Sequence, residues 1–238
     1  MIFAAGLGTR LKPLTDTMPK ALVPVSGKPL LEHIIEKLKS AGFDEIIINV
    51  HHFSEQIALF LAEKNNFGIR IEISDETDLL LETGGGIKKA AAFFDDGKPF
   101  LVHNVDIFSN ADLREMCDFS LKTNALATLL VSKRQTSRYL LFDENGRLAG
   151  WFNEKTGEVK SPYKNLNINN YEKLAFGGIH VISPKIFELM NNWTGKFSII
   201  DFYLSLCDKH KICAYVPENL KLLDVGKVDS LDAINNLV

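Results

Sequence analysis

The chain of 238 residues has a net charge of −3, and 46% of its residues are hydrophobic while 24% are charged. This composition is that of a globular protein with a sizeable core, which excludes disordered and fibrous classes and gives no global charge for binding nucleic acid. The apolar runs are far shorter than the roughly 20 residues of a membrane span, and no basic signal-peptide region opens the chain. Cys117, Cys207 and Cys213 show no C-x-x-C spacing, which indicates core residues rather than disulfides or a zinc site. We expect a cytoplasmic protein whose partners include neither nucleic acid nor a membrane.

Strand-like apolar segments alternate with helical patterns through the first half of the chain. Strands are predicted over 2–5, 45–50, 69–74 and 99–103, and helices over 29–41, 54–65, 85–94 and 111–122. Ser109 or Asn110 is placed to cap the last of these helices. The alternation predicts an α/β fold with a doubly wound, mostly parallel, mixed Rossmann-like sheet.

The pattern changes after Asn124, where extended segments joined by turns predict added β-hairpin structure in the second half. The hairpin signals are "DENG" and "EKTG", and the polar residues 158–173 indicate a surface loop. Helices over 184–191, 198–209 and 229–237 and strands over 212–216 and 221–223 complete the expected elements. We find no internal repeat.

A long loop, "AAGLGTRLKPLTDTMPK", follows the first predicted strand. In an open parallel sheet, ligands bind at the carboxyl ends of the strands, which is where this loop falls. Gly6 and Gly8 can take positive φ and allow close approach, so that successive backbone N–H groups form an anion site. Arg10, Lys12 and Lys20 add positive charge to the same loop.

Two common phosphate-binding motifs do not fit this loop. A Rossmann fingerprint requires a third glycine where Leu11 stands, and a P-loop requires G-K-[ST] at the start of a helix. Pro13 and Pro19 also prevent a regular helix here. For the two glycines alone, a simple turn beside a solvated Arg10 is the favoured alternative, but the loop as a whole favours a functional role.

The loop resembles the signature of the sugar-1-phosphate nucleotidyltransferases, A-A-G-x-G-T-R…P-x-T…P-K, at every signature position. The resemblance continues more weakly through "LLETGGGIKKA", "LVHNVD", "AFGGIHVI" and "LLDVG". It implies an enzyme that transfers a nucleotidyl group from a nucleoside triphosphate (NTP) to a sugar 1-phosphate and releases pyrophosphate. Short N-acetylmuramate-1-phosphate uridylyltransferases and mannose-1-phosphate guanylyltransferases are the most similar members. The implied domain covers 1–238, with a nucleotide-binding half at 1–124 and an acceptor-binding half at 125–238.

The resemblance assigns the nucleotide to the opening loop and to the glycine-rich segment "LETGGG". The implied nucleotide-binding residues are Ala5, Gly6, Gly8, Thr9, Arg10, Gly84 and Gly85. The implied catalytic residues are Arg10, Lys20 and Asp106. The loop would hold the phosphates that leave as pyrophosphate, and Lys20 would contact phosphate oxygens at the reacting centre. A flexible helix entry is the alternative reading of Gly84 and Gly85.

A triphosphate normally arrives with Mg²⁺, which prefers carboxylate oxygens. Asp106 and Asp224 each follow an apolar run, so both carboxylates are expected at strand ends on the edge that carries the loop. The resemblance makes both of them Mg²⁺ ligands, whereas the alternative is that each caps a helix or turn. Val105 stands where the family pattern N-G-D has its glycine, which calls the metal geometry into question.

The resemblance also assigns the acceptor sugar to Asn104, Glu154, Lys155 and Gly177. Thr156 replaces the proline of the family's E-K-P motif, and a hairpin turn is an equally good reading of that segment. A strand bulge is the alternative for Gly177.

Two other functions stay open at this point. Val105 and Thr156 favour a nucleotide-binding module without turnover, and the short chain also suits a phosphocholine-type cytidylyltransferase. The reaction needs no imidazole, so His51, His52 and His103 are expected to be structural. The sequence leaves open the nucleobase, the acceptor and the quaternary state, a homodimer included.

Overall fold

The computed structural model describes residues 1–226, and the helix expected over 229–237 lies outside them. The chain forms two compact units, and each is assembled from separate parts of the sequence. Unit 1 takes Met1–Leu81, Val102–Arg114 and the described part of Lys221–Val238, while unit 2 takes Glu82–Leu101 and Glu115–Leu220.

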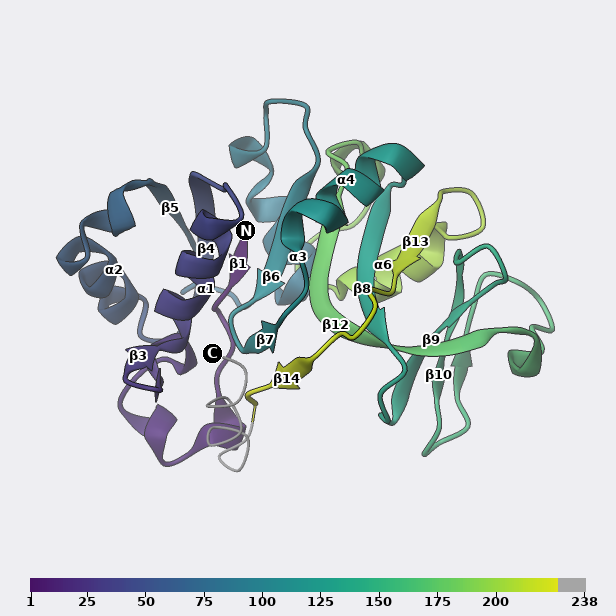
Figure 1. Ribbon diagram of the computed structural model, residues 1–238, viewed down its shortest axis with the longest axis horizontal. Helices are drawn as coiled ribbons and strands as arrows, with labels where there is room; N and C mark the ends of the chain where they lie inside the picture. The colour runs from purple at the N-terminus through teal and green to yellow at the C-terminus, as the bar shows by residue number, and fades with distance from the viewer. Residues whose placement is uncertain (227–238) are drawn as a thin grey trace. The chain divides into compact units, whose positions relative to one another are not determined.

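Unit 1 contains a parallel sheet with the strand order β6-β1-β4-β5 (Figure 1). Its strands are β1 (Ile2–Phe3), β4 (Glu45–Val50), β5 (Arg70–Asp75) and β6 (Phe100–Asn104), of which the last three residues of β6 belong to this unit. Ile2 of β1 lies opposite Ile48 on one side and His103 on the other. All residues of β4 after Glu45 are buried, as expected for a parallel strand covered on both faces.

Two helices and two small antiparallel sheets complete most of unit 1. The helices are α1 (Leu30–Ser40) and α2 (Ser54–Glu63), and α4 (Leu113–Thr123) begins in this unit. One is a hairpin that joins β2 (Pro24–Val25) to β3 (Lys28–Pro29), and the other pairs two strands distant in the sequence, β7 (Ile107–Ser109) and β14 (Leu222–Asp224). Leu31, Ile35 and Leu38 of α1 recur at helical spacing and are buried, so one face of this helix belongs to the core.

Unit 2 contains a mostly antiparallel sheet with the order β13-β8-β12-β9-β10-β11. Its strands are β8 (Ala127–Ser132), β9 (Arg138–Phe142), β10 (Leu148–Asn153), β11 (Val159–Lys160), β12 (Glu172–Ile182) and β13 (Ile212–Tyr215). Its helices are α3 (Glu82–Lys89), α5 (Ile186–Leu189) and α6 (Ile199–Leu206), with most of α4. Phe142, Phe202 and Tyr203 are its largest fully buried side chains.

The α/β class, with a mostly parallel sheet followed by added β-hairpin structure, is confirmed. Both predicted hairpin turns are present. In the first, the Asp143 N–H donates to the Arg147 carbonyl oxygen at 2.9 Å, and Gly146 has a φ of 68°. In the second, the Gly157 N–H donates to the Asn153 carbonyl oxygen at 2.8 Å, and Gly157 has a φ of 74°. Among residues 1–226, every helix is too short or too polar to span a bilayer.

Two local expectations were wrong, and a third was incomplete. The helix expected over 85–94 occupies Glu82–Lys89 instead, so the glycines lie inside it rather than at its start. The cap of α4 is neither Ser109 nor Asn110, because the Arg114 N–H donates to Asp112 Oδ1 at 2.9 Å. The segment 158–173 does lie at the surface, with none of its residues buried, but it also contains β11 and a short 3₁₀ turn, Ile168–Asn170.

Candidate functional site

The opening loop of unit 1 runs from the end of β1 through three short 3₁₀ turns, Thr9–Leu11, Leu14–Asp16 and Lys20–Leu22. The Leu11 N–H donates to the Gly8 carbonyl oxygen at 2.8 Å, which closes the first turn. The segment therefore has an ordered backbone without a regular α-helix, in agreement with the positions of its prolines.

Gly6 and Gly8 have different roles in this loop. Gly8 has a φ of +65°, and an added Cβ would lie 2.8 Å from Thr15 Cγ2. Thr15 Oγ1 also donates to the Gly8 carbonyl oxygen at 2.9 Å, so Gly8 is held inside the loop. Gly6 does not have the positive φ expected of it, and no described atom lies within 4 Å of its Cβ position. The exposed face at Gly6 is thus the part of the loop that a ligand can approach closely.

Lys20 and Asp106 form an ion pair between two distant parts of the sequence. Lys20 Nζ donates to Asp106 Oδ2, and the two side chains are 11% and 16% exposed. Lys20 starts the third 3₁₀ turn of the loop, and Asp106 follows β6. The fold thus brings one predicted catalytic lysine to one predicted metal ligand.

Asp224 lies next to Asp106 because β14 pairs with β7. Asp224 is opposite Ile107 in this antiparallel pair, and the Val225 N–H donates to the Asp106 carbonyl oxygen at 2.8 Å. Oδ1 of Asp224 is buried and has no hydrogen-bond partner among the described residues. A buried carboxylate oxygen without a partner is the kind of donor that Mg²⁺ prefers, and the backbone after Asp224 is bonded to the backbone of the second acid, Asp106.

Gly226 is a site residue that sequence reasoning missed. A Cβ atom on Gly226 would lie 2.6 Å from Arg10 Nη2 and 2.7 Å from Asp224 Oδ1. The available signal was a glycine two residues after a candidate metal ligand in "LLDVG". The side chains of Arg10 and Asp224 therefore both occupy the space that a side chain at position 226 would fill.

A buried polar network holds the first residue of the loop, Ala4, and sequence reasoning missed it too. The Ala4 N–H donates to Asn49 Oδ1 at 2.8 Å, and Asn49 Nδ2 donates to Glu76 Oε1 at 2.8 Å. The other oxygen of Glu76 accepts from the Leu81 N–H at 3.0 Å. Because buried and satisfied polar groups fix a unique geometry, this network fixes the point where β1 enters the loop.

The three histidines make contacts within unit 1 that suit a structural role. His103 is fully buried, and its burial lowers the pKa to about 4, so the ring is neutral at physiological pH. His51 Nδ1 lies 2.6 Å from the Glu76 carbonyl oxygen, and the His52 ring centroid lies 3.9 Å from that of Phe53.

Gly84 of unit 2 lies directly against an aromatic ring. A Cβ atom on Gly84 would lie 2.3 Å from two ring carbons of Phe197, and the Gly84 N–H donates to the Phe197 carbonyl oxygen at 2.9 Å. The Gly85 N–H points to the same oxygen at 3.4 Å. The close approach that three glycines indicated is therefore made, at Gly84, by another part of unit 2.

The predicted acceptor residues of unit 2 lie in a turn and a bulge. Glu154 and Lys155 are exposed in the turn between β10 and β11, where the Lys155 N–H donates to Asn153 Oδ1 at 3.0 Å. Gly177 is buried in β12 beside a register shift in its pairing with β8, and the positive φ of 72° belongs to Gly178. The backbone at Glu154 and Lys155 is thus the hairpin turn, and the backbone at Gly177 is the strand bulge, that were stated as alternatives to an acceptor site.

The predicted site residues thus divide between the two units. Unit 1 holds Ala5, Gly6, Gly8, Thr9, Arg10, Lys20, Asn104, Asp106 and Asp224. Unit 2 holds Gly84, Gly85, Glu154, Lys155 and Gly177.

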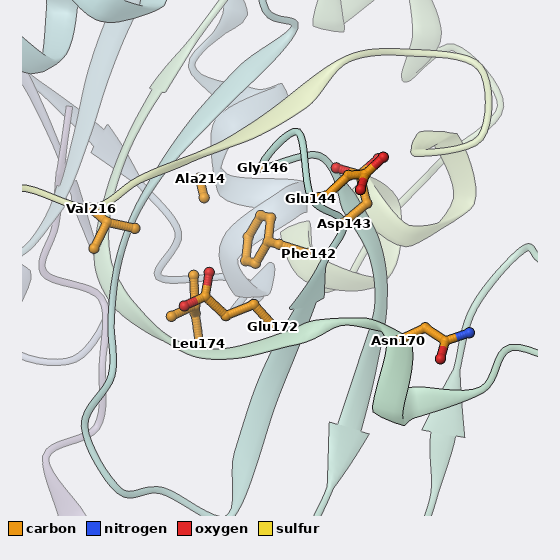
Figure 2. A pocket seen from close by; sticks show the side chains of 9 residues that line it. All are labelled: Phe142, Asp143, Glu144, Gly146, Asn170, Glu172, Leu174, Ala214 and Val216. Atoms are coloured by element: carbon orange, nitrogen blue, oxygen red, sulfur yellow. The ribbon is translucent and has the colours of Figure 1, made fainter.

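A cavity of about 400 Å³ in unit 2 contains none of these residues (Figure 2). Its lining is Phe142, Asp143, Glu144, Gly146, Asn170, Glu172, Leu174, Ala214 and Val216. Every charged side chain in that lining is a carboxylate, which would repel a polyphosphate. The loop of unit 1, with its cations, remains the better phosphate site.

Known proteins resemble this chain over most of its length. The sequence profile of the nucleotidyl transferase family matches residues 1–238. N-acetylmuramate alpha-1-phosphate uridylyltransferase of Caulobacter vibrioides is 33% identical over 227 residues, which are 92% of this chain and 88% of that protein. Mannose-1-phosphate guanylyltransferase 1 of Arabidopsis thaliana is 31% identical over 194 residues, 79% of this chain but 50% of that longer protein.

A solved structure shares the fold. UDP-glucose pyrophosphorylase complexed with UDP-glucose superimposes with a TM-score of 0.76 at 20% identity, covering 99% of this chain and 95% of that chain. The loop signature, the adjacent acids and the profile match all indicate the same class of protein. The chain belongs to the nucleotidyl transferase family, among the sugar-1-phosphate nucleotidyltransferases.

Proposed function

We propose that this enzyme transfers a uridylyl group from UTP to a sugar 1-phosphate in the presence of Mg²⁺, with N-acetylmuramate 1-phosphate as the first candidate acceptor. The observation that carries the chemistry is the cluster of Lys20, Asp106 and Asp224 beside the glycine loop. The uridine and the acceptor are proposed from the similarity to the Caulobacter protein, of which this chain covers most of the length.

The reaction needs one bond to form and one to break. A phosphate oxygen of the sugar 1-phosphate attacks the α-phosphorus of the NTP, and the bond from that phosphorus to the bridging oxygen of the β-phosphate breaks. Pyrophosphate carries away the electron pair, and the NDP-sugar remains. Such transfers depend on positioning and charge neutralisation rather than on a covalent intermediate with the protein.

The loop residues of unit 1 supply the positioning. Gly6, Gly8 and Thr9 would offer backbone N–H groups to the β- and γ-phosphates, and Ala5 precedes them in the loop that follows β1. The Arg10 guanidinium would neutralise charge on the leaving pyrophosphate. Lys20 would contact oxygens at the α-phosphorus, where negative charge develops during the attack.

Asp106 and Asp224 would hold Mg²⁺, which when bound neutralises phosphate charge. Val105, which replaces the usual glycine, is buried in unit 1, and the Val105 N–H donates to the Phe3 carbonyl oxygen at 3.1 Å. The larger residue is thus part of the strand packing beside β1.

Residues of unit 2 complete the proposed assignment. Gly84 and Gly85 would contact the nucleobase and ribose, and Glu154, Lys155 and Gly177 would contact the acceptor, together with Asn104 of unit 1. The nucleotide-binding half at 1–124, the acceptor-binding half at 125–238, the cytoplasmic location and a homodimer also remain predictions.

The test is pyrophosphate release by the purified enzyme with three substrate pairs: UTP with N-acetylmuramate 1-phosphate, GTP with mannose 1-phosphate, and CTP with phosphocholine. We expect turnover with the first pair, and none when EDTA replaces Mg²⁺. Turnover with only the second or third pair would replace the uridylyl proposal with that chemistry. UTP binding without pyrophosphate release from any pair would indicate a nucleotide-binding module instead.

A further inference from the structure

Lys20 and Asp106 have separate partners in the proposed reaction but are paired with each other here. In the proposed reaction, the Lys20 ammonium binds a phosphate and the Asp106 carboxylate binds Mg²⁺. In the structure, Lys20 Nζ donates directly to Asp106 Oδ2. A divalent cation on the same carboxylate would lie close to the ammonium, and like charges at such a separation repel each other strongly.

We infer that Lys20 is an internal substitute for the metal, so that Mg²⁺ and the triphosphate bind cooperatively. In the nucleotide-free protein, the ammonium neutralises Asp106 and competes with a metal ion for that carboxylate. A triphosphate withdraws Lys20 from Asp106, and a metal ion displaces Lys20 toward the phosphate. Each ligand therefore removes the competitor of the other. This inference rests on the proposed roles of Lys20 and Asp106.

Because the Lys20–Asp106 ion pair is largely buried, its attraction is strong enough to compete with a metal ion for the carboxylate. Only 11% of the Lys20 side chain and 16% of the Asp106 side chain are exposed, so water and salt screen their attraction poorly. The same loop contains a contrasting pair, Lys12 and Asp16, with Nζ 3.0 Å from Oδ1 and exposures of 60% and 49%. An exposed pair of this kind contributes little.

The second acid is arranged differently. Oδ1 of Asp224 has no hydrogen-bond partner among residues 1–226, although both it and Arg10 Nη2 lie close to the Cβ position of Gly226. The site therefore presents one carboxylate oxygen that needs a cation and one carboxylate that a lysine already neutralises. A metal ion alone can satisfy the first, but it must displace Lys20 to gain the second.

The first arm of the test measures metal binding without nucleotide. Mn²⁺ is titrated into the protein, and free Mn²⁺ is followed by electron paramagnetic resonance. Wild type is compared with Lys20→Gln and with the control Lys12→Gln, which removes the same charge from the same loop. We expect Lys20→Gln to bind Mn²⁺ at least about 5-fold more tightly than wild type, which is the low end of typical coupling between sites. Lys12→Gln should match wild type.

The second arm measures phosphate binding without metal. Inorganic tripolyphosphate is titrated calorimetrically in the presence of EDTA. Asp106→Asn, which keeps the shape of the side chain and removes its charge, should bind tripolyphosphate at least about 5-fold more tightly because Lys20 is released. The control Asp16→Asn removes the same charge from an exposed position and should match wild type. This arm stays informative if Lys20→Gln fails to fold.

Several results would overturn the inference. Unchanged Mn²⁺ affinity in Lys20→Gln would do so, as would unchanged tripolyphosphate affinity in Asp106→Asn. Equal changes of affinity in the controls Lys12→Gln and Asp16→Asn would also overturn it. They would show that the affinities depend on the net charge of the loop and not on the Lys20–Asp106 pair. The proposed function fails separately, through a lack of pyrophosphate release by the wild-type enzyme. An active wild type with unchanged affinities in the variants would leave the function intact and remove only the coupling.

Discussion

Arg10 and Gly226 are so close that a Cβ atom on the glycine would lie 2.6 Å from Arg10 Nη2. The same atom would lie 2.7 Å from Asp224 Oδ1. Side-chain atoms do not pack at such distances, so any substitution at Gly226 must move a proposed phosphate ligand, a proposed metal ligand or both. Gly226 thereby ties the geometry of the two functional groups to one backbone position.

We therefore predict that Gly226→Ala lowers turnover by about 10²–10³-fold, the usual cost of removing one preorganised group that stabilises the transition state. Thermal unfolding should change little, because Arg10 is exposed and can turn away. Gly27→Ala is the control, since Gly27 has a φ of +81° and no atom of residues 1–226 lies within 4 Å of its Cβ position. That variant should lose stability but keep turnover. Full pyrophosphate release by Gly226→Ala would show that the close contact has no catalytic role.

Substitutions of the two loop glycines should change different properties, stability for Gly8 and nucleotide binding for Gly6. Gly8→Ala forces an alanine into a left-handed conformation against Thr15 and should destabilise the protein by about 1–2 kcal/mol in urea unfolding. Gly6→Ala should leave the unfolding midpoint unchanged, because its Cβ meets no described atom. It should instead weaken UTP binding, measured by calorimetry with Mg²⁺ present, since the new methyl group occupies the face that the phosphates approach. Wild-type UTP affinity in Gly6→Ala would place the phosphates elsewhere.

Asp224→Asn tests the unpartnered carboxylate. Because Oδ1 of Asp224 has no hydrogen-bond partner among residues 1–226, the amide loses no bond there, and the unfolding free energy without metal should not fall. Turnover with Mg²⁺ should fall by about 10²-fold or more. The rise in unfolding temperature that Mg²⁺ with UTP gives the wild type should shrink, because a ligand stabilises only as far as it binds. The metal assignment would be wrong if this variant kept both turnover and that rise.

The sequence predicted the elements that depend on local pattern. The signature loop, the helix that buries Leu31 and Ile35, and both hairpin turns follow from residues that are close along the chain. The parallel sheet and the position of both acids after apolar runs also follow, because the carboxyl ends of parallel strands share one edge. These features together were sufficient to identify the candidate phosphate site.

The sequence did not predict the contacts that fix the geometry of the site. Lys20 and Asp106 are 86 residues apart, and nothing local to either residue encodes their pairing. Gly226 matters only because Arg10 and Asp224 reach the same point, and the glycines at 84 and 85 were assigned to a ligand although Phe197 packs on the first of them. Each of these features depends on a partner that becomes adjacent only when the chain has folded.

The contact between Gly84 and Phe197 gives a prediction about packing in unit 2. A Cβ atom on Gly84 would overlap two ring carbons at 2.3 Å, so Gly84→Ala should destabilise the protein by about 1–3 kcal/mol, the usual cost of overpacking. Phe197→Leu should leave room for that methyl group. The double variant should then lose less stability in urea unfolding than the two single variants together. Strict additivity would mean that the ring does not limit the size of residue 84.

A buried pair in unit 2, His180 and Tyr203, should make the free energy of unfolding depend on pH. His180 is 1% exposed, and its Nδ1 lies 2.8 Å from the Tyr203 hydroxyl oxygen. Burial lowers the pKa of His180 from 6.5 to about 3. The ring is therefore neutral in the folded protein at pH values where the unfolded chain already takes up a proton.

Because the folded pKa lies below the unfolded one, the stability that His180 contributes is complete above about pH 6.5 and is lost as the pH falls toward about 3. We predict that His180→Gln flattens the acid limb of the unfolding free energy by up to about 1.4 kcal/mol per pH unit in that window, measured by urea unfolding. Tyr203→Phe is the matched control. It should cost about 1–3 kcal/mol at neutral pH by leaving Nδ1 unpaired, yet keep the slope, because the histidine still titrates. Equal slopes in wild type and His180→Gln would assign the acid sensitivity to other groups.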